Sequence, residues 1–297
     1  MGFDIWALLG VATKFILYLG VLVACGAVLF RLVFRDILFR AADWGAHLAS
    51  TSVRSTLLWF SLIGVIASVS SFFVSAVILT GDASGIGNIE ILGQLWDGPV
   101  GGSFSFRISG LALMITSLLF PRGGRFLALL GVALVLWSFG KVGHATRFEF
   151  PWLEVILSLH LACVAFWIGI LLPLYRLAGD PAHLKDAADL AHRFGQIASV
   201  VVPVLMLSGL IFAWNLLGSF SVLFGTFYGG TLIGKTVIVG GLLGLAAMNK
   251  TRHVPALMRG EMQAAQQLRR TILFEWAAIV TILMVTAVLT SLLIVPK

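Results

Sequence analysis

The chain has 297 residues, of which 59% are hydrophobic and 11% charged, and its mean hydropathy is +1.03. Soluble domains are about 45–50% apolar and about 25% charged, so this composition excludes a water-soluble globular protein. The net charge of +7 comes from 20 Lys and Arg against 13 Asp and Glu. In a membrane protein such an excess reports the topology of the loops rather than nucleic-acid binding. We therefore expect an all-α, polytopic bundle in a lipid bilayer.

Eight stretches of the chain are long and apolar enough to cross a membrane as helices of about 20 residues. In chain order they cover residues 6–30, 56–79, 104–120, 125–141, 152–175, 192–217, 229–248 and 272–294. The sequence PRGGR at 121–125 predicts a tight turn between the third and fourth of them. The stretches leave no room for a soluble domain, so we expect one integral membrane domain over 1–297.

The segment 31–54 has an apolar stripe at helical spacing, with charged residues away from the stripe. Two structures fit this pattern. The segment lies on the inner membrane surface, which is the interpretation that we favour, or it extends the first helix past the bilayer.

Basic residues are distributed unequally between the two sets of loops. Fourteen Lys and Arg fall in 31–54, 121–125, 176–193 and 249–270, whereas the opposite face carries four, namely Arg107, Lys141, Arg147 and Lys297. Cytoplasmic loops are enriched in Lys and Arg, so the first set is predicted to be cytoplasmic. With eight spans, both termini then lie outside the cytoplasm. The two cysteines, Cys25 and Cys163, differ in depth by about 14 Å, which predicts that they form no disulfide.

Polar or ionisable side chains inside spans are costly and are therefore candidates for function. Six residues qualify: Lys14, His160, Asn215, Lys235, Asn249 and Glu275. For Asn215, Asn249 and Glu275 we favour a structural role, and Glu275 is expected to pair with Arg269 or Arg270. Lys14 and Lys235 would repel a cation in their vicinity. They extend to the outer interface or pair with Glu154.

His160 is the strongest candidate for a metal ligand. Cys163 and Trp167 follow it at i+3 and i+7 and share its helix face. A neutral imidazole in a span either ligates a metal or bonds to a neighbouring helix, and position alone favours neither. The same two alternatives, metal or solvent, apply to His144 in the outer GHATR segment.

Three methionines, Met114, Met206 and Met284, have a predicted depth similar to that of His160 and Cys163. Thioether, thiol and imidazole groups select Cu(I) over hard cations. Methionine is also common packing material, and for any single one of these three we favour a role in the core.

Several motifs occur in a fixed order along the second half of the chain. They are Gly143-His144-Ala145, LEVILSLHLACVAFWIGILLPL (153–174), HRFGQIA (192–198), SGL (208–210), YGGTLIGKTVIV (228–239), AAMNKTRHVPAL (246–257) and LRRTILFEWAAIVTILMVTAVLTSL (268–292). This ordered set resembles the copper resistance protein D (CopD) family. The match is loose over 1–139, where Arg107 opens the third span, and rich in motifs over 140–292.

The resemblance implies a bacterial inner-membrane protein that moves copper from the periplasm toward the cytoplasm. It also implies a periplasmic copper-binding protein as a partner, expected here to be a separate chain. The expected metal ligands are His144, His160, Cys163, Met206 and Met284, and the other functional candidates are Trp167, Lys235, Glu275, Arg107 and Lys14.

We expect a copper permease, with Cu(I) as the favoured ion, rather than an enzyme. The chain has no phosphate-binding Gly-x4-Gly-Lys-Ser/Thr motif for ATP. The alternative is a membrane haem or electron-transfer protein, or a factor in cuproenzyme assembly. In the haem alternative, Lys14, Lys235 and Arg107 neutralise propionates, and His160 needs an axial partner such as His144 or a methionine.

Overall fold

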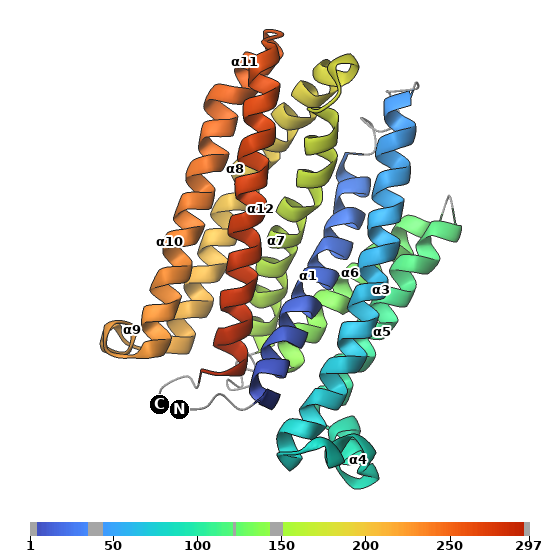
Figure 1. Cartoon of the computed structure of the whole chain (residues 1–297), viewed down its shortest axis with the longest axis vertical. Helices are drawn as coiled ribbons and strands as arrows, with labels where there is room; N and C mark the ends of the chain where they lie inside the picture. Colours follow the sequence, from blue (N-terminus) through green and yellow to red (C-terminus); the bar gives the residue numbers. More distant parts are fainter. Residues whose placement is uncertain (1–4, 35–43, 121–122, 143–150, 294–297) are drawn as a thin grey trace.

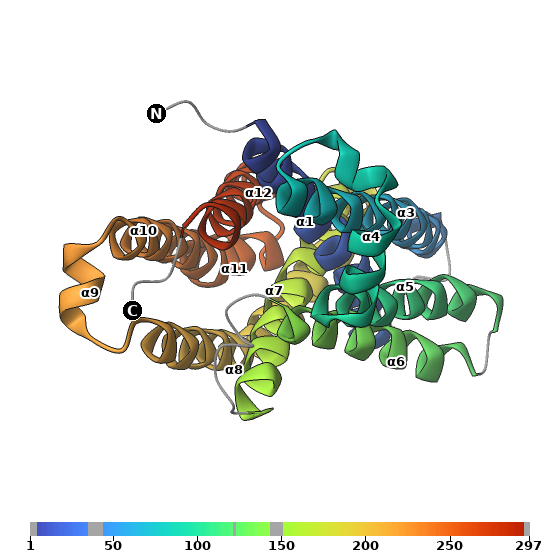
Figure 2. The same ribbon diagram turned by 90° about the horizontal axis from the view of Figure 1, so that it is seen from below.

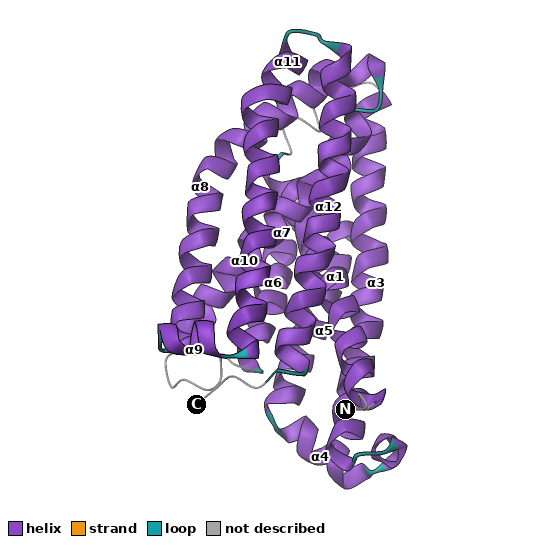
Figure 3. Ribbon diagram, turned by 60° about the vertical axis from the view of Figure 1, so that its left-hand side comes forward, coloured by secondary structure: helices purple, strands orange, loops and turns teal. Residues whose placement is uncertain are grey.

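The structure is a computed structural model that describes residues 5–34, 44–120, 123–142 and 151–293. Within these ranges all regular elements are helices and none is a strand (Figure 3). The long helices run side by side in one elongated bundle (Figure 1). The all-α prediction is therefore confirmed.

Eight of the described helices are long and apolar enough to cross a membrane, as the hydropathy predicts. They are α1 (Ile5–Val33), α3 (Trp44–Thr80), α5 (Pro99–Thr116), α6 (Gly124–Trp137), α7 (Pro151–Leu177), α8 (Leu184–Leu217), α10 (Phe227–Met248) and α12 (Met262–Ser291). Helix α6 reaches spanning length together with the helical turn that follows it, as Gly124–Lys141. Both α8 and α12 begin well before the predicted spans. Their first turns are polar, so hydropathy alone does not include them in a span.

Shorter helical segments connect the spans. They are η1 (Ala83–Gly87), α4 (Ile89–Asp97), η2 (Ser117–Leu119), η3 (Ser138–Lys141), η5 (Pro181–His183), α9 (Phe220–Gly225), the π-helical turn η6 (Asn249–His253) and α11 (Val254–Met258). Side-chain caps set several boundaries: Asn88 accepts from two backbone N–H groups of α4, and Thr226 accepts from Gly229 at the start of α10. Gly218 ends α8 with a φ of 68°, a left-handed conformation that favours glycine.

The segment 31–54 differs from the favoured expectation in the part that is described. Helix α3 begins at Trp44 and continues without interruption into the second span, so 44–54 is not a separate surface helix. Residues 35–43 lie outside the described residues.

The two ends of the bundle differ in what they carry. Helix α1 begins and α12 ends at the end that holds α4 and α9, which we call the α4 end (Figure 1). The opposite end holds the ends of α1 and α7, the beginnings of α3, α8 and α12, and α11. We call it the basic end, because the loops rich in Lys and Arg connect these helices.

Helix α1 is central to the bundle and packs against α3, α7 and α12 (Figure 2). It approaches α7 closely where Gly26 faces Gly169 backbone to backbone. A Cβ on Gly26 would lie 2.8 Å from the Gly169 nitrogen, so neither position has space for a side chain. Small residues at such crossings let membrane helices pack closely.

Helices α8 and α10 lie at the periphery of the C-terminal half. Helix α8 packs on α7, and α10 packs on α12. Figure 2 shows α8 and α10 apart from one another, with α9 connecting them. His160, Lys235 and Glu275 lie on α7, α10 and α12, so all three candidates belong to this half of the bundle.

Candidate functional site: a histidine and its neighbours within the spans

His160 on α7 faces α8. Its Nδ1 lies 3.2 Å from the Leu205 carbonyl oxygen and 3.2 Å from Ser208 Oγ. Gly209 provides the space for the ring, because a Cβ there would lie 3.2 Å from His160 Cε1. The helix register of α8 therefore places a carbonyl, a hydroxyl and a glycine against one edge of the imidazole.

The hydrogen bonds at Nδ1 fix the tautomer of His160. The hydroxyl of Ser208 lies 2.9 Å from the same Leu205 carbonyl and can donate to it. A carbonyl oxygen only accepts, so its contact with Nδ1 requires that Nδ1 carries the proton. The lone pair of a neutral ring is then on Nε2, for which the described residues provide no hydrogen-bond partner. This is the arrangement in which a backbone carbonyl orients a metal-binding histidine.

The other predicted metal ligands are placed differently. Cys163 is buried with a free thiol, as is Cys25, so the absence of a disulfide between them is confirmed. Met206 is half-buried on α8, next to Leu205. Met284 is 40% exposed on α12. His144 lies outside the described residues.

Met114 is fully buried and packs against Gly131 of α6, as the favoured role in the core predicts.

The described residues contain no group of three or more His, Cys, Asp or Glu side chains that could hold a metal ion together. A cavity of about 180 Å³ lies elsewhere in the described part of the bundle. It is lined largely by apolar groups of α1, α3, α7 and α12, including Val23, Phe60, Ile168 and Trp276. The arrangement at His160 is thus a single imidazole whose Nε2 has no hydrogen-bond partner among the described residues, and not a closed chelate.

Lys235 on α10 lies within electrostatic range of His160. Within the part of the chain that the structure describes, it forms no ion pair and no hydrogen bond. The expected alternative of a pair with Glu154 is wrong, because Glu154 binds Lys141 instead. A positive charge within electrostatic range of His160 weakens the binding of any cation there and attracts anions.

Lys14 has a different partner from the predicted one. Its Nζ donates to the Thr290 carbonyl oxygen at 2.7 Å, near the end of α12. Unpaired carbonyls at the C-terminus of a helix attract cations, so this contact stabilises the helix end. The predicted alternative of a pair with Glu154 is wrong for Lys14 as well.

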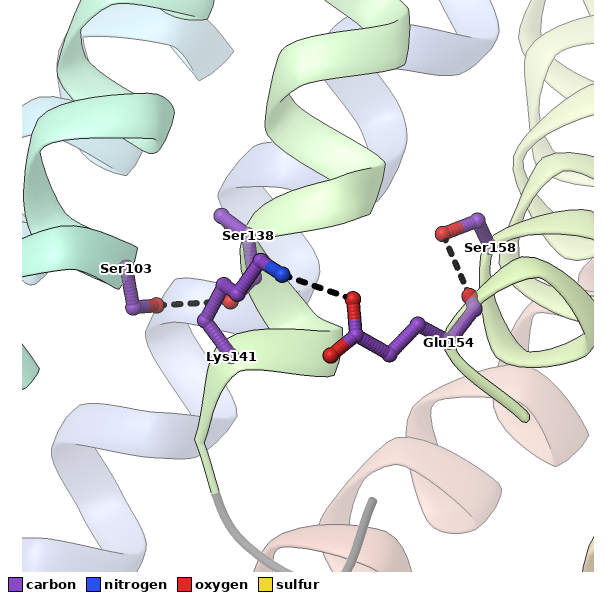
Figure 4. A network of polar contacts seen from close by, with 5 residues as sticks. All are labelled: Ser103, Ser138, Lys141, Glu154 and Ser158. Carbon is purple, nitrogen blue, oxygen red and sulfur yellow. Dashed lines mark hydrogen bonds and ion pairs between the residues drawn. The ribbon is translucent and has the colours of Figure 1, made fainter. Parts of the chain in front are cut away.

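Arg107 is 5% exposed and lies between α5 and α6. Its Nε donates to Ser138 Oγ at 3.2 Å, its Nη2 donates to Ser103 Oγ at 2.8 Å, and its guanidinium lies over the Phe139 ring. Ser103 in turn donates to the Ser138 carbonyl oxygen at 2.7 Å (Figure 4). These contacts hold α5 to the end of α6 near the α4 end. The guanidinium of Arg107 therefore obtains its hydrogen bonds from side chains of the protein itself.

An ion pair connects the flanks of the segment that contains His144. Lys141 Nζ lies 2.8 Å from Glu154 Oε2 (Figure 4). Lys141 ends η3 and Glu154 is in the first turn of α7. The pair brings the two ends of this connection together at the α4 end.

Glu275 is bound differently from the expectation. The predicted pair with Arg269 or Arg270 is wrong, because Arg269 lies over the Tyr175 ring and the carboxyl group of Glu275 faces other partners. Trp167 Nε1 donates to Glu275 Oε2 at 3.0 Å, and Asn249 Nδ2 donates to Oε1 at 2.7 Å. His160 and Trp167 share one face of α7, but they have different partners. His160 contacts α8, whereas Trp167 donates to Glu275 on α12.

Sequence reasoning missed the partners Ser208, Gly209 and Thr271. Two signals were present. The motif SGL at 208–210 contains both Ser208 and Gly209. Pro255, six residues after Asn249, lacks the N–H that an α-helix requires, which indicates an irregular helix next to Asn249. The π-helical turn accommodates this proline, and such turns are frequent at functional sites.

The eight apolar helices and the polar groups within them define a multi-pass membrane protein. Two family models match the chain: "Copper resistance protein D-like, N-terminal domain" over residues 5–149 and "Copper resistance protein D" over 188–289. The chain belongs to the copper resistance protein D family, which confirms the resemblance seen in its motifs.

Two relatives of known name support this assignment. The chain is 27% identical to the inner membrane protein YebZ of Escherichia coli (strain K12) over 86% of this chain and 93% of that protein. It is 29% identical to the copper transport protein CutJ of Bacillus subtilis (strain 168) over 50% of this chain, and the match spans 27% of that longer protein. No solved structure matches the chain. The protein is thus an inner-membrane member of a copper resistance and transport family.

Proposed function

We propose that the protein conducts copper ions across the inner membrane, from the α4 end to the basic end. The excess of Lys and Arg in the loops of the basic end supports a cytoplasmic location for that end and a periplasmic location for both termini. A separate periplasmic copper-binding protein then delivers copper at the α4 end. The name of the relative CutJ and the family of the chain support copper as the ion.

The observation that carries this proposal is the hydrogen bond between His160 Nδ1 and the Leu205 carbonyl oxygen. It leaves Nε2 as a ligand position within the span. Cu(I) prefers imidazole, thiol and thioether ligands, and Cys163 and Met206 are the soft candidates nearest to His160 along α7 and α8. His144 and Met284 remain proposed ligands at other points of the path.

Conduction requires weak binding at several positions, because a closed site of high affinity retains its ion. Lys235 supports weak binding at His160. Its charge opposes that of a copper cation within electrostatic range of the ring. We infer that Lys235 shortens the time that copper spends on His160.

The test is to replace His160 with Ala and to measure cellular copper after induced expression. We expect uptake to fall to the level of cells without the protein, while the control His183→Ala, at the basic end, keeps the uptake of the parent. A second variant, Lys235→Leu, removes the charge without adding a sulfur ligand and is expected to bind Cu(I) more tightly in equilibrium measurements on the purified protein. Parental uptake by His160→Ala at equal expression would end the assigned role of His160.

Haem binding is the second candidate, and one observation favours it. Lys235 has no partner among the described residues and would suit an anionic propionate close to His160. Haem ligated by two histidines requires facing imidazoles at similar depth. The described histidines other than His160 are all towards the basic end: His47 near the start of α3, His183 in η5, His192 near the start of α8 and His253 in η6. A visible absorption spectrum of the purified protein decides: a Soret band supports haem, and bound copper without that band supports transport.

A further inference from the structure

Glu275 is the centre of a buried polar network to which the proposed copper ligands do not belong. Its two carboxyl oxygens accept from Trp167 Nε1 at 3.0 Å and from Asn249 Nδ2 at 2.7 Å. Thr271 Oγ1 lies 2.6 Å from Asn249 Oδ1. The four residues are at most 9% exposed and come from α7, η6 and α12. The network therefore joins three elements inside the bundle.

No described cation compensates a negative charge on Glu275. The basic groups of the elements packed around it lie elsewhere. Lys235 is 14 residues before Asn249, about 21 Å along α10. The others bind other groups or are exposed: Arg269 lies over Tyr175, Arg176 donates to Ser52, Lys250 donates to Ser199, His253 interacts with Gln267, Lys14 donates to Thr290, and Arg270, Arg252 and Arg31 are exposed. An ionised carboxylate buried without a cation is costly. Binding a proton removes this cost, provided that the protonated group also has its hydrogen bonds.

The network satisfies the ionised form of Glu275. In that form both oxygens only accept, and Trp167 and Asn249 provide one donor each. The hydroxyl of Thr271 donates to the amide oxygen of Asn249. Every polar group of the network is then paired.

The network equally satisfies the protonated form after one change, a flip of the Asn249 amide. The new Glu275 O–H donates to Asn249 Oδ1, and Nδ2 then donates to Thr271 Oγ1. The hydroxyl of Thr271 turns to the Leu268 carbonyl oxygen, which lies at 2.8 Å. Trp167 donates to the other carboxyl oxygen in both forms. Two complete arrangements with one proton of difference are what a proton-binding site requires, because neither form leaves a buried group unpaired.

We propose that Glu275 is a proton-binding site within the membrane span and that it releases its proton when copper passes. The step forms or breaks only the O–H bond of the carboxyl group, and the proton is exchanged with water. Trp167 follows His160 by seven residues, about 10 Å along α7 toward the basic end. An ionised Glu275 therefore attracts a copper cation from His160 in the inward direction. The link to copper rests on the proposed function, whereas the proton binding itself does not.

The first experiment measures proton binding without any copper. Infrared spectra of the purified protein are recorded between about pH 5 and about pH 9, a range that includes the pKa values of buried carboxyl groups. We expect a protonated carboxyl band that titrates in the parent and in the control Glu261→Gln, an exposed residue paired with Arg259. The band is lost in Glu275→Gln. A band that remains in Glu275→Gln, or a parent without a titrating buried carboxyl, would overturn the assignment.

A second variant covers the case in which Glu275→Gln does not fold. Trp167→Phe removes a donor whose bond is stronger to the charged than to the neutral carboxyl group. The midpoint of the titration is then expected to move to higher pH, and an unchanged midpoint contradicts the proposal.

The second experiment measures Cu(I) uptake at several external pH values. We expect uptake by the parent to depend on pH and uptake by Glu275→Gln to lose this dependence. A dependence that persists in Glu275→Gln refutes the coupling to copper. If no variant transports copper, the infrared titration still decides whether Glu275 binds a proton, so failure of the proposed function is distinguished from failure of this inference.

Discussion

The crossing of α1 and α7 provides a quantitative test of the fold. A Cβ on Gly169 would lie 2.9 Å from the Gly26 Cα and in hard overlap with the Gly26 carbonyl group. Non-bonded carbon atoms rest about 3.5–4.0 Å apart, so Gly169→Ala requires a separation of about 1 Å between the helices. Such overpacking costs about 1–3 kcal/mol. We expect the free energy of unfolding, measured by denaturant titration in mixed micelles, to fall by that amount.

Two comparisons isolate the cause of this loss. Gly240→Ala on α10 adds the same methyl group where nothing lies within 4 Å, and it should leave the stability unchanged or slightly increased. The double variant Gly26→Ala/Gly169→Ala should lose less than the two single losses added together, because one separation of the helices accommodates both methyl groups. Full stability of Gly169→Ala, or an equal loss in Gly240→Ala, would refute the close backbone contact.

Three further predictions concern polar contacts near the α4 end. Arg107→Met leaves buried hydroxyl groups without their donor and should lower the free energy of unfolding by about 1–3 kcal/mol in the same titration. Lys141→Met breaks the ion pair with Glu154, whose two side chains are 33% and 19% exposed. The free energy of unfolding should therefore fall by no more than about 1 kcal/mol, because water screens such a pair. A larger fall would contradict this exposure of the pair. Asp82 caps η1 by accepting from the backbone N–H of Ser84. The hydroxyl and the backbone N–H of Ser84 hold the pKa of the Asp82 carboxyl below its usual value. The capping bond is therefore present at neutral pH and is lost as the pH falls through that lowered pKa. Amide exchange at Ser84, corrected for the intrinsic rate, should accelerate in Asp82→Ala at neutral pH and in the parent only in acid.

The spans were predictable from the sequence because their length and apolarity follow from the thickness of the bilayer alone. Each predicted stretch contains most of a described helix, from α1 to α12. The errors lie at the ends, for example at Leu184 of α8, where the helix continues into polar sequence. The hydrocarbon core requires helices but does not determine where they end outside it.

The partners of the polar side chains were not predictable in the same way. The depth of Glu275 was compatible with Arg269, yet its carboxyl group bonds to Trp167 and Asn249 from two other elements. The partner of a side chain depends on the rotation of its helix and on which helices are its neighbours. The hydropathy of a single helix specifies neither the rotation nor the neighbours. Lys14, whose partner is a backbone carbonyl oxygen, had no side-chain signal at all.

A common rule explains which of these residues are structural. A polar group in a span must be paired, because the bilayer core supplies no hydrogen bonds. Arg107 and Lys14 obtain their bonds from the protein itself, and Glu275 does so in either protonation state. His160 obtains its bonds at Nδ1 alone, and Lys235 obtains none from the described residues. Within the described spans, His160 Nε2 on α7 and the Lys235 ammonium group on α10 are therefore polar groups whose bonds the protein itself does not supply, and our proposal that a ligand binds at His160 rests on this difference from Arg107, Lys14 and Glu275.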